Sequence, residues 1–274
     1  MTKLRANLFV VVLSALAILT IGGLALAGNV VIKGSTTVLP IAQKAAEEFM
    51  KLHPNVSISV SGGGSGNGMK ALIDGSTDIA DASRFIKDKE IKLAIANGVF
   101  PVAHRVALDC VVPVVHPSNS LSNITMAQLK DIYTGKVTNW SQLGGPDKKI
   151  VVISRDTSSG TYEVWEKKVL KGAKVTPKAL LQASNGAVAQ AVAKNKYAIG
   201  YIGIGYVSSA VKALKVNNIT ASAATARNGS YPVSRPLFMF TNGWPTGDTL
   251  DFINFVISPA GQKIAEEEGY VPLY

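Results

Sequence analysis

Four short segments of the chain combine hydroxyl residues with glycine or arginine in a pattern suited to binding an anion. They are Gly34-Ser35-Thr36-Thr37, residues 62–68 (GGGSGNG), Asp81-Ala82-Ser83-Arg84 and residues 155–161 (RDTSSGT). Hydroxyls and the free backbone N–H groups at a helix start donate hydrogen bonds to oxyanions, glycine lets the backbone approach a ligand, and arginine adds a forked cationic donor. Singly, each segment is also typical of a helix cap, a loop or a solvated arginine. Together they predict a dry cage for a small oxyanion.

The glycine-rich segment does not match the nucleotide-binding motifs. A P-loop requires Gly-Lys followed by Ser or Thr, whereas Gly68 is followed by Met69 and then by Lys70-Ala71. The pattern G-x-G-x-x-G also fails, because Gly62-x-Gly64 leads to Asn67. These mismatches disfavour a nucleotide as the ligand.

The elements that must position these segments alternate between strands and helices. Hydrophobic periodicity predicts strands at 30–33, 56–61, 78–80, 107–115, 150–154, 198–202 and 236–240. It predicts helices at 39–52, 69–74, 87–97, 126–133, 162–170, 187–194, 248–257 and 259–268. This order is typical of mainly parallel sheets flanked by helices, in which ligands bind beyond the carboxyl ends of the strands. We therefore expect two α/β lobes with a ligand between them.

Length and composition limit the classes of protein that fit. The chain has 274 residues, 47% of them apolar and 17% charged, with one cysteine and a formal net charge of +10. These values exclude a disordered chain and a disulfide scaffold, and the length suits two lobes. The basic charge permits nucleic acid, anionic lipid or a small anion as partner. Lysine and arginine form no run of five and aromatic residues are not interleaved with them, so nucleic acid is disfavoured.

The N-terminus has the pattern of a secretory signal peptide. Lys3 and Arg5 precede an uncharged apolar run over residues 8–27 that ends in Ala25-Leu26-Ala27. We expect cleavage after Ala27, which leaves 247 residues with a net charge of +8, and export to the periplasm or the cell exterior. The alternative is an uncleaved anchor, because about 20 apolar residues can span a bilayer. No cysteine directly follows the run, so a lipid anchor is not expected.

Five stretches of the chain together resemble the phosphate-binding proteins of the PstS type that serve ABC transporters. They are VIKGSTTVLPIAQKAAEEF, SGGGSGNGMKALIDGSTDIADASR, LKDIYTGKVTNWSQLGG, ISRDTSSGTYEVW and SPAGQKIAEEEGYVPL. The resemblance implies an α/β protein with the two-lobed type II periplasmic-binding-protein fold, in which each lobe has a mainly parallel sheet flanked by helices. It places the ligand in the interlobe cleft. We assign residues 28–112 and 233–274 to lobe I and residues 113–232 to lobe II.

The resemblance also implies which residues bind the anion. They are Thr36, Thr37, Ser65, Ser83, Arg155, Ser159, Gly160 and Thr161, with Ser35, Gly66, Asp81 and Arg84 as further candidates. The third segment departs from well-known members, in which a carboxylate that accepts the proton of hydrogen phosphate stands at the position of Ser83. Because sulfate lacks such a proton, a serine here predicts measurable but weaker rejection of sulfate. Sulfate and arsenate are therefore alternative ligands.

The expected partners follow from the same resemblance. We expect inorganic phosphate as the ligand, the permease and ATPase of an ABC transporter as partners, a monomeric protein and no cofactor. The rival hypothesis is a secreted phosphatase or other hydrolase with Ser159 or Ser65 as nucleophile, which would need a nearby base. The histidines, His53, His104 and His116, form no recognisable Ser-His-Asp order, and the sequence has no metal-ligand spacing. A binding protein without catalytic activity or a bound metal is therefore predicted.

Overall fold

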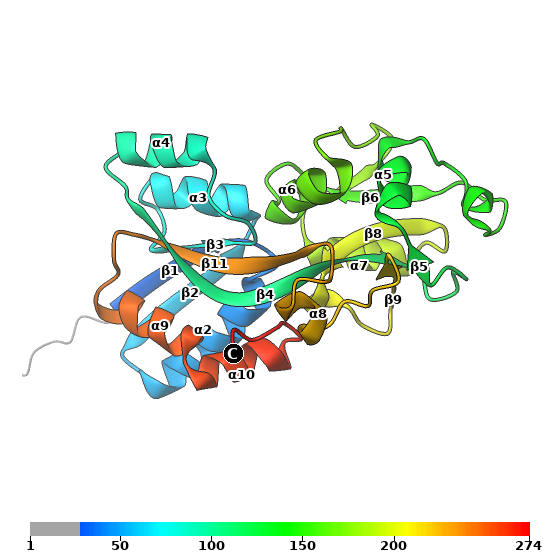
Figure 1. The fold of residues 1–274 in the computed structure, drawn as a ribbon. Coiled ribbons are helices and arrows are strands. Elements are labelled where there is room, and N and C mark those ends of the chain that lie inside the picture. Colours follow the sequence, from blue (N-terminus) through cyan, green and yellow to red (C-terminus); the bar gives the residue numbers. More distant parts are fainter. Residues whose placement is uncertain (1–27) are drawn as a thin grey trace, which may run out of the picture.

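The computed structural model describes residues 28–274, and the expected signal peptide at residues 1–27 lies outside this range. Within residues 28–274 no helix is both long enough and apolar enough to cross a membrane. The described chain forms two halves, each with strands and flanking helices, and the strands β4 and β11 run from one half toward the other (Figure 1).

One continuous mixed sheet passes through both halves. Its strand order is β2-β1-β3-β11-β4-β8-β6-β7, and β9 pairs with β4 off this path. The strands are β1 (Gly28–Gly34), β2 (Val56–Gly62), β3 (Ile79–Ala82), β4 (Pro101–Val115), β6 (Val151–Arg155), β7 (Leu180–Gln182), β8 (Ala198–Gly203), β9 (Lys212–Ala213) and β11 (Ser234–Asn242). The strands β5 (Asn123–Ile124) and β10 (Lys215–Val216) form a separate pair.

The sheet contains two parallel groups that are joined by antiparallel strands. β1 is parallel to β2 and β3, while β6 is parallel to β7 and β8. β11 is antiparallel to β3 and β4, and β4 is antiparallel to β8. The carboxyl ends of the two parallel groups therefore supply the turns that the sequence analysis singled out.

Helices flank the sheet in both halves. They are α2 (Leu39–Leu52), α3 (Ser65–Ile73), α4 (Asp88–Ala96), α5 (Met126–Thr134), α6 (Gly160–Trp165), α7 (Asn185–Ala193), α8 (Ala223–Arg227), α9 (Gly247–Ile257) and α10 (Pro259–Glu267). α6 continues into a five-residue π-helix, Glu166–Leu170. The predicted alternation of strands and helices and the division into two lobes are thus confirmed.

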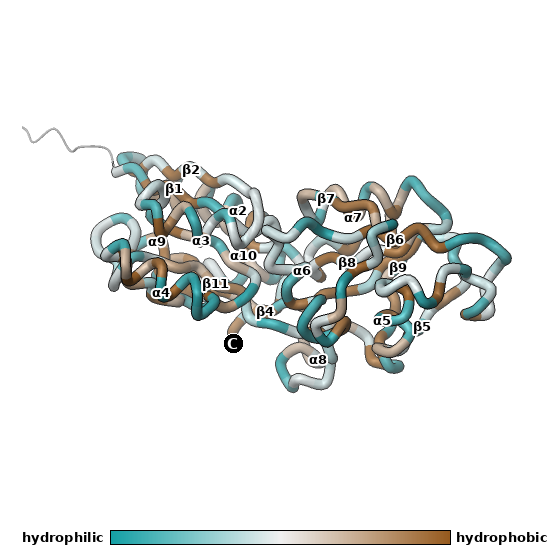
Figure 2. Tube along the Cα trace, turned by 90° about the horizontal axis from the view of Figure 1, so that it is seen from above, coloured by the Kyte–Doolittle hydropathy of each residue, from teal (hydrophilic) through white to brown (hydrophobic). Residues whose placement is uncertain are grey.

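Each half has its own apolar core. Helix α2 buries Ile41 and Phe49 on one face, because residues at helical spacing share a side of the helix, and Phe49 contacts Phe252 of α9 edge to face. In the other half, Trp165 stacks on Tyr201 with ring centroids 4.4 Å apart. Figure 2 shows that β8 and α7 of this half carry hydrophobic residues along much of their length. The packed cores hold the strand ends in place.

Helix α3 begins earlier than predicted. It starts at Ser65 instead of Met69, because the chain turns at Gly64, whose φ of 100° favours glycine, and the helix follows at once. The glycines in its first turn weakened the helical pattern in the sequence. Gly68 is needed there, since a Cβ atom would lie 2.7 Å from the Cα of Gly34. The early start brings Ser65 to the helix N-terminus.

Strand β4 is also longer than predicted. It begins at Pro101 instead of residue 107, and its pairing with β11 extends to the partners Pro101 and Asn242. The polar residues His104 and Arg105 interrupt the apolar run, so the sequence pattern did not include residues 101–106 in the strand. Antiparallel pairing with β11 extends the strand over these residues despite the local pattern.

Candidate anion-binding site

The first hydroxyl-rich segment forms the turn between β1 and α2. Ser35 shapes this turn, since its backbone N–H donates to the carbonyl of Asp81 (2.8 Å) and its Oγ accepts from the backbone N–H of Thr37 (3.1 Å). Thr36 and Thr37 are buried just before α2 begins at Leu39. The turn therefore fixes the backbone that carries both threonine hydroxyls.

The serines of the second and third segments lie against each other. Ser65 is the first residue of α3, and Ser83 follows β3. Their Oγ atoms are 3.3 Å apart, and the backbone N–H of Ser83 donates to Ser65 Oγ at 3.0 Å. Gly160 of the fourth segment packs on this pair, because a Cβ there would lie 2.4 Å from Ser65 Oγ and 2.8 Å from Ser83 Oγ. Three segments thus meet at a point where only glycine fits.

The fourth segment starts helix α6 and joins the first segment at Thr161. Ser159 caps the helix, because its Oγ accepts from the backbone N–H of Tyr162 at 3.2 Å. The Oγ1 atoms of Thr161 and Thr37 are 3.0 Å apart. The structure therefore brings hydroxyls from all four segments together. We call this buried cluster the cage, and it comprises Thr36, Thr37, Ser65, Ser83, Ser159, Gly160 and Thr161.

Arg155 ends strand β6 and is buried with its charge unpaired. Its Nε donates to the carbonyl of Gln182 (3.0 Å) and its Nη2 to the carbonyl of Ala183 (2.9 Å). Its Nη1 is buried and has no hydrogen-bond partner within residues 28–274. Burial lowers the pKa of Arg155, the negative charge of Asp156 opposes this shift, and the positive charge of Arg235 adds to it more weakly. Neutral carbonyls hold two of its nitrogens, and the third is free to bind an anion.

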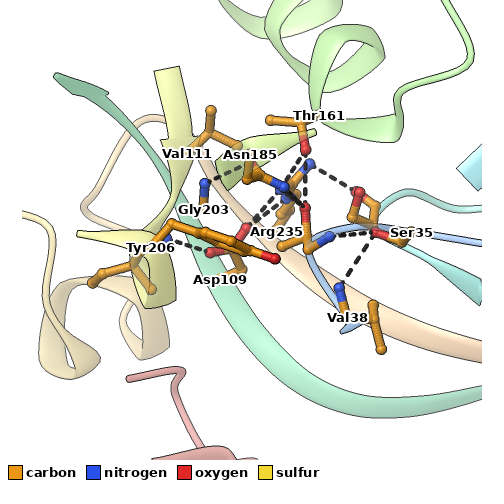
Figure 3. A network of polar contacts seen from close by, with 12 residues as sticks. Ser35, Val38, Asp109, Val111, Thr161, Asn185, Gly203, Tyr206 and Arg235 are labelled. Carbon is orange, nitrogen blue, oxygen red and sulfur yellow. Dashed lines mark hydrogen bonds and ion pairs between the residues drawn. The ribbon is translucent and has the colours of Figure 1, made fainter. Parts of the chain in front are cut away.

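Asn185 is the first of three residues at the site that the sequence analysis did not identify. It is fully buried at the start of α7, and its Nδ2 donates to Thr36 Oγ1 (3.1 Å) and Thr37 Oγ1 (3.0 Å). Its Oδ1 accepts from the backbone N–H of Gly203 (3.1 Å). Asn185 thereby links α7 to the turn before α2 (Figure 3).

Arg235 and Asp109 are the other two, and they form a buried ion pair on β11 and β4. The Nε of Arg235 donates to Asp109 Oδ2 (2.8 Å), and the charged Nη2 lies 2.7 Å from the same oxygen. The hydrogen bonds of Nη2 go to Thr37 Oγ1 (3.2 Å) and Thr161 Oγ1 (3.0 Å) (Figure 3). Asp109 Oδ1 accepts from the backbone N–H of Ile204 at 2.9 Å. The pair brings a second guanidinium to the cage, with a carboxylate that balances its charge.

Arg84, one of the further candidates, is engaged elsewhere. Its guanidinium pairs with Glu90 (2.6 Å) and with Glu163 (2.7 Å), and Lys87 also pairs with Glu163 (2.7 Å). We call these four residues the ion-pair bridge, because Glu163 lies on α6 and the other three lie between the end of β3 and the first turn of α4. Beside the bridge is a groove of about 610 Å³ whose lining includes Arg235 but none of the cage residues.

Asp81 and Gly66, two more candidates, also have surroundings of their own. Neither carboxylate oxygen of Asp81 has a hydrogen-bond partner in the described chain, and burial raises the pKa of this group well above its ordinary value. The structure therefore does not join the Asp81 carboxyl to the cage. The backbone N–H of Gly66 donates to the carbonyl of Ser158 (2.9 Å), which is a contact between the two halves.

The histidines do not approach the serines of the cage. His53 stacks on Phe49, His104 contacts Thr241 (2.9 Å) and His116 contacts Ser118 (2.8 Å). Ser65 and Ser159 thus have no histidine as a base, which nucleophilic catalysis by serine would need. Over residues 28–274, no three His, Cys, Asp or Glu residues group together as ligands for a metal ion would.

Comparison with known proteins places the chain in a family. A sequence model of the PBP superfamily domain matches residues 22–260. The phosphate-binding protein PstS of Bacillus subtilis is 33% identical over 248 residues, which cover 90% of this chain and 81% of the relative. The PstS of Staphylococcus epidermidis is 36% identical, with 87% of this chain and 77% of the relative covered. The chain belongs to the PstS family of phosphate-binding proteins.

Solved structures agree with membership of the PstS family. A Clostridium perfringens protein, described as a phosphate ABC transporter substrate-binding protein and crystallised with bound phosphate, has 35% identity and a TM-score of 0.83. The match covers 90% of this chain and 100% of that one. A phosphate transport receptor from Vibrio cholerae of the ABC type has 34% identity and a TM-score of 0.71, covering 88% and 99%. PstS proteins are substrate-binding proteins and not enzymes, and this chain shares their two-lobed fold.

The residues that sequence reasoning missed had weak local signals. Arg235 stands in SRPLFMF, where it is the charged residue of an otherwise apolar strand, and Asn185 follows the helix cap Ser184. A single arginine within an otherwise apolar strand does indicate a buried ion pair, because a buried charge needs a partner. The partner, Asp109, is 126 residues away in the chain, so only the strand pairing reveals it.

Proposed function

We propose that this chain binds inorganic phosphate in the cage and delivers it to an ABC transporter. The observation that carries the proposal is Arg155, a buried guanidinium whose Nη1 has no hydrogen-bond partner and which forms no salt bridge within residues 28–274. A buried cation without a counter-ion is costly, and a bound anion would supply both the missing charge and the missing acceptor. The neighbouring hydroxyls would bind the remaining oxygens of a tetrahedral anion.

The charges around the cage favour an anion held mainly by neutral donors. Arg235 is balanced by Asp109, so Arg155 supplies the one net positive charge among these three residues. Hydroxyls of threonine and serine donate without charge, and each fits one oxygen of a small anion. In this proposal Arg155 contributes the charge, and Thr36, Ser65, Ser83, Ser159, Gly160 and Thr161 are the neutral groups that bind the anion. Thr37 supports Thr161 from behind, through the contact between their hydroxyls.

We also propose the lobe boundaries and a closing motion. Residues 28–112 and 233–274 would form lobe I and residues 113–232 lobe II, because the apolar clusters divide near these positions on β4 and β11. The hydroxyl of Tyr206 donates to the carbonyl of Thr36 (2.6 Å), and Gly66 contacts Ser158 across the same boundary. Separation of these contacts would admit phosphate, and their formation would enclose it.

We expect incomplete rejection of sulfate, and no rejection of arsenate on this basis because hydrogen arsenate carries the same proton as hydrogen phosphate. The carboxylate of Asp109, which contacts Arg235, could in principle accept the proton of hydrogen phosphate. Its two oxygens already accept hydrogen bonds from Arg235 and from the N–H of Ile204, so it is not available for this role. Ser83 would then accept the proton of hydrogen phosphate, and a rotatable hydroxyl can instead donate to sulfate. Rejection by a serine should therefore be weaker than rejection by a carboxylate.

The cellular setting belongs to the same proposal. The apolar N-terminal run would direct export, and the mature protein would act as a monomer outside the cytoplasm with the permease and ATPase of the transporter. The family relationship supports this setting, since the Vibrio cholerae neighbour is described as a receptor for ABC-type phosphate transport.

Titration calorimetry of the purified chain with phosphate, sulfate and arsenate tests the proposed ligand. We expect saturable binding of phosphate with one site, and weaker binding of sulfate. Incubation with p-nitrophenyl phosphate serves as the test for catalysis, and we expect no release of nitrophenol. Equal affinity for phosphate and sulfate would contradict the selectivity, and absence of phosphate binding would contradict the function.

A further inference from the structure

The side chain of Asn185 has only one chemically consistent orientation. The backbone N–H of Gly203 lies 3.1 Å from one of its terminal atoms, and an N–H can only donate, so that atom is the amide oxygen. The amide nitrogen therefore faces the other way and gives its two hydrogens to Thr36 and Thr37. Asn185 acts on the cage as a fixed donor.

Thr37 Oγ1 consequently receives two hydrogen bonds from groups that cannot accept. One comes from Asn185 Nδ2 (3.0 Å) and the other from Arg235 Nη2 (3.2 Å). A hydroxyl oxygen has two lone pairs and one hydrogen. Since both lone pairs are occupied, Thr37 must be the donor in its 3.0 Å contact with Thr161.

The hydrogen bond from Thr37 determines what Thr161 can do. Thr161 Oγ1 accepts from Thr37 and also from Arg235 Nη2 (3.0 Å), so its own lone pairs are occupied as well. Its single hydrogen then has no acceptor among its recorded contacts within residues 28–274. Thr161 therefore offers a hydrogen, and no lone pair, to a bound anion.

We propose that Asn185 determines the protonation state of the phosphate that the cage binds, by making Thr161 a donor-only group. The proposal rests on the proposed function and names the preferred form as the dianion HPO₄²⁻. This form has one proton, and Ser83 Oγ can accept it, since no N–H group of residues 28–274 donates to this oxygen. The monoanion H₂PO₄⁻ has a second proton, which would meet the hydrogen of Thr161 without an acceptor.

The test replaces Asn185 by alanine in the mature chain. Asn185→Ala frees a lone pair on Thr37, so the contact between Thr37 and Thr161 can reverse and Thr161 can accept a proton from the monoanion. Phosphate and sulfate affinities are measured by calorimetry at roughly pH 5 and pH 8, on either side of the second ionisation of a phosphate group. Sulfate carries no proton in this range and reports the titration of the protein alone.

Two further variants make the result specific. Thr37→Val, which is nearly isosteric, removes the hydrogen bond to Thr161 directly and gives a second route to the same change if Asn185→Ala does not fold. Ser184→Ala is the matched control, because Ser184 caps the same helix by accepting from the backbone N–H of Ala187 (3.0 Å) and has no contact with the threonines.

We expect the ratio of phosphate affinity at the higher pH to that at the lower pH to fall by at least about threefold in Asn185→Ala and Thr37→Val. The ratio for sulfate stays constant, and Ser184→Ala keeps the wild-type ratio for phosphate. An equal loss of phosphate affinity at both pH values, or the same shift in Ser184→Ala, would overturn the role of Asn185. Wild-type protein that binds no phosphate would overturn the proposed function instead.

Discussion

The cage and the ion-pair bridge both place a buried arginine between the two lobes, but the two arginines are partnered differently. Arg84 in the bridge has a carboxylate on each side, Glu90 and Glu163. Arg155 beside the cage contacts two backbone carbonyls and keeps one nitrogen free. Burial near the contact between the lobes is therefore insufficient to identify an anion-binding arginine. An uncompensated charge with a free donor is the distinguishing feature.

The difference in partners predicts different roles for the two regions, with lobe closure at the bridge and anion binding at the cage. The bridge contains Arg84, Lys87, Glu90 and Glu163, so its formal charges cancel and it can hold the lobes together without attracting an anion. The cage keeps the charge of Arg155 for the ligand. Mutations in the cage should therefore weaken phosphate binding strongly, and mutations in the bridge should weaken it less, by changing how tightly the lobes close.

The largest effect is expected from Arg155→Ala. The variant leaves the anion among neutral dipoles without a counter-charge, and we expect phosphate affinity to fall at least about 100-fold, roughly 3 kcal/mol. Calorimetric titration measures the loss. Arg227→Ala, on helix α8, is the control and should keep wild-type affinity. A loss of less than about threefold in Arg155→Ala would show that this residue does not bind the anion.

A smaller loss is expected from Gly160→Ala. The new methyl group would lie 2.4 Å from Ser65 Oγ and 2.8 Å from Ser83 Oγ, so both hydroxyls must rotate or shift. We expect a decrease in phosphate affinity of about tenfold or more, together with a lower melting temperature because the methyl group overpacks a buried contact. Gly186→Ala is the matched control, since its nearest neighbour is 3.7 Å away. Unchanged affinity in Gly160→Ala would contradict the position of the cage.

A weaker and salt-dependent effect is expected from Glu163→Gln in the bridge. The substitution removes the attraction between α6 and both Arg84 and Lys87, while Glu90 remains with Arg84. We expect phosphate affinity to fall less than tenfold, with faster release in stopped-flow measurements and a smaller difference from wild type at high salt. Glu267→Gln, from an exposed pair with Lys263, is the control. A loss as large as that of Arg155→Ala would erase the distinction between the two regions.

The smallest effect on binding is expected from Asp81→Asn, which should instead change the pH dependence of stability. Burial raises the pKa of the Asp81 carboxyl in the folded protein, so the folded state holds this proton more tightly than the unfolded state. Wild-type stability should therefore fall as pH rises above about 4, the ordinary pKa of aspartate, and the amide removes this loss.

Chemical denaturation at several pH values measures the Asp81 effect. The free energy of unfolding of Asp81→Asn, relative to wild type, should increase as pH rises, while phosphate affinity stays within about twofold. A constant difference across pH would mean that the Asp81 carboxyl does not titrate with a raised pKa. A large loss of phosphate affinity would instead place this carboxyl in the binding site.

The hydroxyl segments could be predicted from sequence because each is local. The glycines, serines and threonines of a strand-to-helix turn stand next to one another in the chain, and parallel strands place such turns at one edge of a sheet. Thr37 and Thr161 are 124 residues apart, yet both belong to segments of this kind. The order of strands and helices was therefore enough to predict that the two segments meet.

The network behind the hydroxyls could not be predicted in the same way. The consecutive backbone N–H groups of Gly203 and Ile204 hold the side chains of Asn185 and Asp109, so three segments that are distant in the sequence meet there. Arg84 shows the opposite case, since its place beside Ser83 suggested a ligand while its carboxylate partners lie on α4 and α6. Which charges are already paired depends on tertiary contacts that no local pattern contains.

A crystal structure of the chain with phosphate tests the central claim most directly. We predict the anion between the lobes, with Arg155 Nη1 donating to one of its oxygens and the hydroxyl of Thr161 donating to another. Arg84 should remain paired with Glu90 and Glu163. Phosphate bound to Arg84 or Lys87 in the bridge, with Arg155 Nη1 away from the anion, would contradict the account.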